Sequence, residues 1–206
     1  MEEQKHISTA FDKDLSELNA MVQKLGSLAI TQFETAIDAL ATQHMETLDH
    51  VISNDAKLDE LEAAINEKAV EVIALRSPHA RDLRQVLVAL KIATILERTG
   101  DYARNIANRT RVIAQAGNEN IPGVNIGRMG QVAQEMLRDV MQAYDGHDAK
   151  LALEVWHRDI EVDHMHTAFY KEVLASMARD PNFVATGAHL LFMAKNIERI
   201  GDYATG

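Results

Sequence analysis

The stretch LERTGDYARNI, residues 96–106, decides the fold of this chain. It has the apolar spacing of a helix, yet it carries Gly100 in its middle, between Glu97 and Asp101. A glycine inside a helix costs about 1 kcal/mol relative to alanine, and two carboxylates four positions apart repel each other. The chain repeats this unfavourable arrangement as IERIGDYATG, residues 197–206, so the combination requires an explanation.

The two segments belong to an internal repeat. The acidic pair recurs at an offset of 101 residues, as Glu97 with Asp101 and then Glu198 with Asp202. A second acidic pair recurs in the preceding segments at an offset of 104, as Asp55 with Asp59 and then Asp159 with Asp163. The three-residue difference fits a loop insertion. Each half therefore reads as a helix, a D-x-x-x-D helix and an E-R-x-G-D helix.

The rest of the chain is also helical in pattern. Apolar residues recur at spacings of three and four, and no segment alternates in the way a half-buried strand does. Breaks in the pattern predict six helices; they fall near His44–Thr47, Ser77, Gly117–Gly123, Asp145–His147 and Asp180. We therefore predict an all-α fold of two tandem three-helix bundles related by the repeat, covering residues 1–120 and 121–206.

Composition limits the function. The hydrophobic content of 47% is enough for a packed core, and a net charge of −10 argues against a nucleic-acid binder, which needs a basic face. The absence of cysteine excludes disulfides and thiolate chemistry. No apolar run has the roughly 18 residues that a membrane helix needs, and MEEQKHISTAF at the start does not resemble a secretory signal. We expect a cytoplasmic protein without direct membrane insertion.

The acidic pairs have the spacing of a metal site. Side chains at i and i+4 share one helix face, with Cβ atoms roughly 5 to 6 Å apart. If the second and third helices of a bundle pack together, four carboxylates converge, which suits a hard cation such as magnesium, calcium or manganese. The glycine then leaves room for a close approach. His166 corresponds to Glu62 in the first half, and its imidazole makes the second site the better candidate for iron or zinc.

Two other interpretations of these residues remain open. In acidic helical proteins such pairs are often a solvated face neutralised by basic residues, here Arg84 and Arg98, and the protein would then be a plain dimerising bundle. Arg98 and Arg199 also compete with a metal for the carboxylates.

The third interpretation is a ferritin-like di-iron enzyme or metal store. Glu154-x-x-His157 and Glu161-x-x-His164 have its Glu-x-x-His motif. Both copies lie on one helix, however, whereas that site needs facing helices. The chain has no phosphate loop, no serine triad order and no dinucleotide fingerprint, so we assign no catalytic residue and expect no enzyme. The sequence assigns no partner-binding surface.

The repeated motif resembles the E-R-x-G-D-x-A-x-N-I signature of the PhoU family of phosphate-signalling proteins. HISTAFDKDLSEL, residues 6–18, and ALRSPHARDLRQVLVALKIATILERTGDYARNIA, residues 74–107, extend the similarity over essentially the whole chain. The resemblance implies two antiparallel three-helix bundles, a homodimer, and metal sites at the E/D-x-x-x-D motifs. The metal would be magnesium, manganese, iron or zinc. Its ligands, with His166 added from the spacing, would be Asp55, Asp59, Glu97, Asp101, Asp159, Asp163, Glu198 and Asp202.

The resemblance also implies a function. Members of the family act as negative regulators of phosphate uptake and of the phosphate-starvation response. They are adaptors that couple the ATPase subunit of a phosphate ABC transporter to the phosphate sensor histidine kinase. One departure stands out: Asn105 of the signature corresponds to Gly206, where the sequence stops, so we expect a clipped last helix and a second metal site that is only partly assembled.

Overall fold

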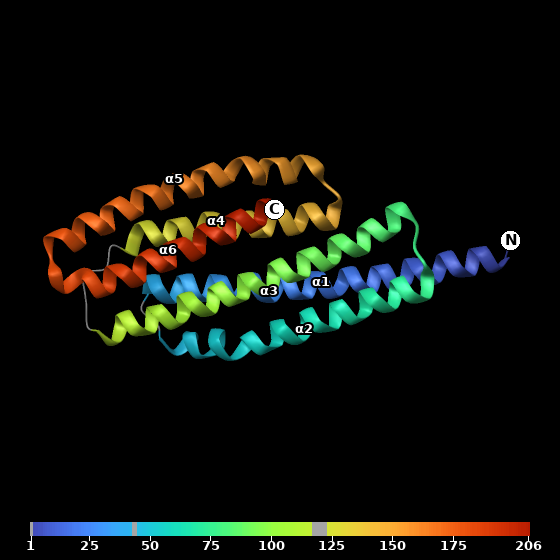
Figure 1. Ribbon diagram of the computed structural model, residues 1–206, viewed down its shortest axis with the longest axis horizontal. Coiled ribbons are helices and arrows are strands. Elements are labelled where there is room, and N and C mark those ends of the chain that lie inside the picture. The colour runs from blue at the N-terminus through green and yellow to red at the C-terminus, as the bar shows by residue number, and fades with distance from the viewer. Residues whose placement is uncertain (1, 43–44, 117–122) are drawn as a thin grey trace. The chain divides into compact units, whose positions relative to one another are not determined.

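The structure, a computed structural model, describes residues 2–42, 45–116 and 123–206. Over these ranges the chain is helical and contains no strand, which confirms the predicted all-α class. The elements follow in the order α1 (Glu2–Thr42), α2 (Glu46–Arg76), α3 (Ala80–Gln115), α4 (Gly123–Gly146), α5 (Ala149–Arg179), a single 3-10 turn η1 (Pro181–Phe183) and α6 (Val184–Thr205) (Figure 1).

The helices end at residues with a positive φ angle or at capping side chains. Ser77 adopts a positive φ of 44° after α2, and His147 adopts a φ of 51° after α4. Asp148 caps α5 because its carboxylate accepts from the amides of Lys150 and Leu151. Asp180 caps the short turn before α6. The predicted breaks at Ser77, Asp145–His147 and Asp180 are therefore confirmed.

Two further predicted breaks concern residues that are only partly described. Residues 43–44, within the break expected at His44–Thr47, lie outside the described residues, and α2 begins at Glu46. Residues 117–122 lie outside them as well, and they include the boundary that we predict between residues 120 and 121. That boundary stays a prediction.

The packing divides the chain into two compact units that do not follow the helix ends. The first unit comprises Met1–Ala29 and Ala56–Arg98, and the second comprises Ile30–Asp55 and Thr99–Gly206. Each of α1, α2 and α3 therefore contributes one segment to each unit. We describe the two units separately.

The first unit is a bundle of three helix segments around aliphatic side chains. Its fully buried residues recur at helical spacing; among them are Leu18, Val22, Leu25, Leu58, Ile65, Val72, Val86 and Leu96. At one edge Asp14 accepts hydrogen bonds from Arg76 Nε at 2.9 Å and from Lys68 Nζ at 3.2 Å. These contacts lower the pKa of Asp14, and hydrogen bonds to Glu17 and Asp14 raise the pKa of Lys68 to about 12.

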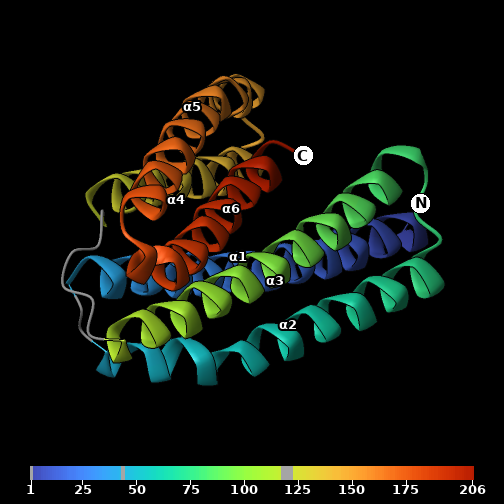
Figure 2. The ribbon, with the colours of Figure 1, turned by 60° about the vertical axis from the view of Figure 1, so that its left-hand side comes forward.

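The second unit contains α4, α5 and α6, which pack pairwise on one another and run side by side (Figure 2). The core is continuous with the segments of α1, α2 and α3 in the same unit, through residues such as Phe33, Val51 and Ile106. α5 turns Val155, Val162 and Phe169 inward at seven-residue spacing. Because this spacing fixes one face of α5 in the core, it also fixes which side chains face α6.

In the described ranges no helix offers a stretch that is both apolar and long enough to traverse a bilayer.

Candidate metal centre

The acidic residues of the second repeat lie on facing sides of α5 and α6. Asp159 and Asp163 are one turn apart on α5, and Glu198 and Asp202 are one turn apart on α6. α6 is held in place by Leu190, Met193, Ala194, Ile197 and Ile200, which are all buried. The helix pairing that the repeat predicts therefore brings this half's carboxylates together.

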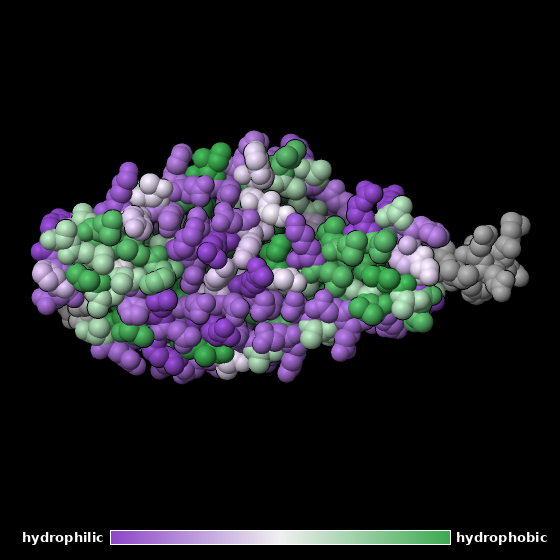
Figure 3. All heavy atoms as spheres, in the orientation of Figure 1, coloured by the Kyte–Doolittle hydropathy of each residue, from purple (hydrophilic) through white to green (hydrophobic). Residues whose placement is uncertain are grey.

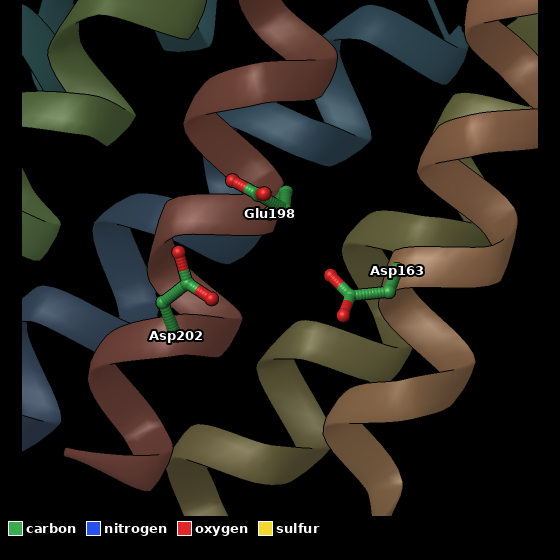
Figure 4. A group of neighbouring side chains, drawn as sticks. All are labelled: Asp163, Glu198 and Asp202. Carbon is green, nitrogen blue, oxygen red and sulfur yellow. The ribbon is translucent and has the colours of Figure 1, made fainter.

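Three of these side chains form a tight group. Asp163, Glu198 and Asp202 each offer one carboxylate oxygen, and these oxygens all lie within 4.8 Å of one another. Figure 4 shows Asp163 reaching from α5 toward the two acids of α6. Two oxygens bound to one cation at 2.3 to 2.6 Å are at most about 5 Å apart. The three oxygens thus have the spacing of ligands around a single ion.

Asp159 extends this acidic group. Its Oδ1 atom is buried and has no hydrogen-bond partner among the described residues. Burial raises the pKa of Asp159, and the charges of Asp163, Asp202 and Glu198 raise it further. A buried carboxylate oxygen without a partner costs free energy, and the donor set is entirely oxygen. The residues present therefore fit a hard or borderline cation.

The structure gives a reason for the glycine at position 201, which costs helix stability. A Cβ atom built at this position would lie 3.0 Å from Asp159 Oδ1 and 3.5 Å from a methyl carbon of Val162. A side chain at position 201 would therefore crowd the carboxylate from the side of α6. The glycine lets α6 approach α5 closely at Asp159, beside the group of Asp163, Glu198 and Asp202. Gly100, its counterpart in the first repeat, is also buried.

Basic residues modify the site on α6. Lys195 Nζ lies within hydrogen-bond distance of both carboxylate oxygens of Glu198. Burial and the charge of Glu198 raise the pKa of Asp202, while Lys195 and Arg199 act in the opposite direction. Arg199, which we considered a competitor for the carboxylates, donates instead to the hydroxyl oxygen of Tyr102 at 3.2 Å. Lys195 is thus the competing cation at this site.

In the first repeat, two of the acids are paired with an arginine. Arg104 Nη1 donates to Asp55 Oδ2, and Arg104 Nη2 donates to Asp101 Oδ1 at 2.6 Å. Asp59 is exposed on α2, and Glu97 is half-buried on α3. Sequence reasoning missed Arg104 entirely. The available signal was its position three residues after Asp101, which places both side chains on one face of the helix.

The histidines of α5 do not join the acidic group. His166 is half-buried, and its ring lies against Tyr170 with centroids 6.3 Å apart. Its role as a ligand stays a prediction. The four side chains of the two Glu-x-x-His motifs, namely Glu154, His157, Glu161 and His164, are all exposed on this one helix. A ferritin-like site instead needs such residues to face inward from different helices.

A duplicated helical-bundle protein, with a carboxylate cluster between the second and third helices of a repeat, is the class that this fold and site define. The PhoU domain model of known families matches residues 22–110 and 126–206, one match for each repeat. The chain belongs to the PhoU family.

Individual relatives agree with this assignment. The chain is 40% identical over 200 residues to the phosphate-specific transport system accessory protein PhoU homolog of Caulobacter vibrioides, covering 97% of this chain and 87% of that protein. Its fold matches PhoU from Pseudomonas aeruginosa with a TM-score of 0.92 at 28% identity, covering 95% and 93% of the two chains. The phosphate transport system regulatory protein PhoU from Streptococcus pneumoniae follows with a TM-score of 0.85 at 28% identity, covering 95% and 91%.

Proposed function

We propose that this chain regulates phosphate transport as an adaptor without enzymatic activity. It couples the ATPase subunit of a phosphate ABC transporter to the phosphate sensor histidine kinase, and it represses phosphate uptake and the starvation response. The support is family membership together with the names of its relatives, which are accessory and regulatory proteins of phosphate transport. The proposal includes a homodimer that acts in the cytoplasm.

An exposed apolar row on α5 is the structural observation that carries the adaptor role. Its members fall in two groups, Leu153, Trp156 and Ile160 and then Tyr170 and Leu174, with the exposed polar residues Asp163, His164 and Thr167 between them. Trp156 is 55% exposed and Ile160 is 54% exposed, whereas Val155 and Val162 of the same helix are fully buried. In Figure 3 apolar atoms interrupt the hydrophilic surface along the edge where α5 runs in Figure 1. Large exposed apolar side chains in one row are typical of protein-binding surfaces.

The internal repeat provides a control for this row. The positions 104 residues earlier on α2 are Asp49, Ile52, Ala56, Asn66 and Val70. Only two of these five are large and apolar, so the repeated fold does not itself require an apolar row at this place. We assign the row on α5 to the transporter ATPase subunit, because the named relatives are accessory to the transport system. Trp and Tyr side chains that become buried on binding, here Trp156 and Tyr170, are among the residue types that supply most of the affinity in typical interfaces.

We further propose that the acidic group of the second repeat binds a divalent or transition metal. Asp159, Asp163, Glu198 and Asp202 would hold it, and magnesium, manganese, iron or zinc are the candidates. The metal would supply positive charge that offsets the repulsion among the four acids and ties α5 to α6. The sequence also predicts that His166 is a ligand and that the first repeat holds a second site at Asp55, Asp59, Glu97 and Asp101. Both stay predictions.

The test is a binding measurement with purified components. The chain, with and without manganese, is titrated into the ATPase subunit and into the cytoplasmic part of the kinase. We expect binding to both, with W156E weakening the ATPase interaction about tenfold or more. V70E is the matched control, since Val70 is the exposed counterpart of Leu174 in the first repeat. Absence of binding to either partner contradicts the adaptor role, and iron-dependent oxygen consumption supports the enzyme instead.

A further inference from the structure

The guanidinium of Arg104 occupies the place between two acids of the first repeat. It contacts Asp55 with one terminal nitrogen and Asp101 with the other. All three residues lie in the second compact unit, on α2 and α3. A guanidinium is planar, permanently charged and donates along fixed directions, so it can bridge two carboxylates as a metal ion does.

Burial makes this bridge necessary. Asp55 is only 6% exposed, and it is the one charged residue among the buried residues that the structure describes. An ionised carboxylate in such a position needs an opposite charge with good hydrogen-bond geometry. Arg104 provides this charge from inside the chain, and its own side chain remains 35% exposed.

The second repeat lacks this internal cation at the equivalent position. Asp55 corresponds to Asp159 and Asp101 corresponds to Asp202, and the offset of 101 residues places Thr205 at the position of Arg104. The hydroxyl of Thr205 donates to the main-chain oxygen of Asp202 at 2.9 Å.

Two observations indicate that the second site is open. Asp159 Oδ1, the buried acid oxygen that corresponds to the bridged acid Asp55, has no partner among the described residues. The basic residue that does approach, Lys195, is 46% exposed and pairs with Glu198, which is 14% exposed. A lysine that is half in contact with solvent neutralises its partner less fully than a buried cation does.

We propose that Arg104 replaces a metal ion in the first repeat, so that the two repeats are unequal: the second binds metal and the first does not. This inference rests on the metal site that we propose for the second repeat. It makes Arg104 the residue that determines how much metal one chain takes up. It also predicts that removal of this one side chain frees Asp55 and Asp101 to bind a metal ion.

The experiment measures manganese per chain, by calorimetric titration and by metal analysis of the full chain after dialysis. In the unsubstituted chain, D163N with D202N should abolish uptake, and D55N with D101N should leave it unchanged. R104T, which installs the residue of the second repeat, should raise uptake about twofold because both repeats then offer carboxylates to the metal. D55N with D101N in the R104T background should remove the gain.

Control variants exclude indirect effects. R104K keeps the charge and should show no gain. R111T removes another arginine of α3, which pairs with the exposed Asp49, and should show no gain either. Circular dichroism shows whether R104T is folded, and R104Q serves as a second neutral variant if it is not.

The outcomes separate the two proposals. A folded R104T or R104Q without added uptake overturns the inference about Arg104. Loss of uptake on D55N with D101N in the unsubstituted chain also overturns it, since the first repeat would then already bind metal. If the unsubstituted chain binds no manganese while R104T does, the site of the second repeat fails and the role of Arg104 stands.

Discussion

Tyr102 and Tyr203 occupy equivalent positions in the two repeats, and their rings stack on each other with centroids 5.9 Å apart and planes inclined by 19°. Each tyrosine directly follows the last acid of its motif, Asp101 in α3 and Asp202 in α6. Arg199 donates to the hydroxyl of Tyr102. The backbones that carry the two acidic motifs are therefore connected by a direct contact between α3 and α6.

Replacement of Tyr203 by alanine tests this contact. Y203A removes the stack and a half-buried ring, so we expect the free energy of unfolding to fall by about 1 to 3 kcal/mol. Urea denaturation followed by circular dichroism measures the change. Y170A serves as the control, because Tyr170 is 45% exposed on α5 and should cost less than Y203A. Equal losses for the two variants would show that the stack contributes nothing specific.

The close approach at Gly201 predicts an effect on metal binding. In G201A the new Cβ lies 3.0 Å from Asp159 Oδ1 and displaces that carboxylate, so we expect weaker manganese binding. The better helix propensity of alanine, about 1 kcal/mol, offsets part of the crowding in the metal-free protein.

Gly127 provides a matched control for this substitution. A Cβ at Gly127 on α4 meets nothing within 4 Å. G127A should therefore stabilise the protein by up to about 1 kcal/mol and leave manganese affinity unchanged. Isothermal titration and thermal unfolding of both variants give the comparison. Unchanged affinity in G201A would mean that the approach of α6 to Asp159 does not matter for the site.

The raised pKa values of Asp159 and Asp202 predict how pH acts on the second repeat. A folded-state pKa above the ordinary value of 3.8 means that the ionised acid destabilises the metal-free fold at neutral pH. D159N should therefore stabilise the metal-free protein at pH 7. The gain should shrink as pH falls through the raised pKa and vanish below the unfolded value of 3.8.

Manganese should reverse the order of stability of D159N and the unsubstituted protein. A bound cation stabilises only the chain that can hold it, so excess manganese should raise the midpoint of thermal unfolding of the unsubstituted protein more than that of D159N. Thermal scans from pH 3 to pH 8, with and without manganese, measure both effects. A D159N protein that is less stable than the unsubstituted chain without metal at pH 7 would contradict the electrostatic account.

Asp14 in the first unit should behave in the opposite way. Hydrogen bonds from Arg76 and Lys68 lower its pKa, so its contribution is present above the unfolded pKa of 3.8 and is lost as pH falls through the lower folded value. D14N should destabilise the protein at pH 7, and the difference should close in acid. D12N, at an exposed position of α1, is the control and should change stability little. Denaturant titrations at pH 7 and in acid check both variants.

Much of the fold could be predicted from the sequence because helices repeat their apolar residues with a fixed period. The same geometry placed Asp163, Glu198 and Asp202 together, since acids four apart share a face and the repeat identified which helices pair. The division into two units could not be predicted. It cuts through α1, whose 41 residues continue the helical pattern across the boundary at Ala29 without a break.

The bridge made by Arg104 escaped prediction for a different reason. The motif itself contains Arg98 and Arg199, and either was a reasonable partner for the acids. Tertiary packing instead directs Arg199 to Tyr102, and Arg104, which bridges Asp55 and Asp101, lies at a position that the signature leaves unspecified. Which of several nearby basic residues reaches a carboxylate depends on side-chain directions that spacing does not encode.

The bridge from Arg104 to Asp55 has a consequence for how the fold depends on ions. The first repeat carries its own counter-charge, so its buried acid is neutralised by the polypeptide itself, whatever the supply of ions in the cell. In the part of the chain that the structure describes, Asp159 Oδ1, on the equivalent acid of α5, has no such arginine. On the metal site that we propose, the fold around Asp55 is therefore complete without any ion, whereas the pairing of α5 with α6 gains stability only when metal is available.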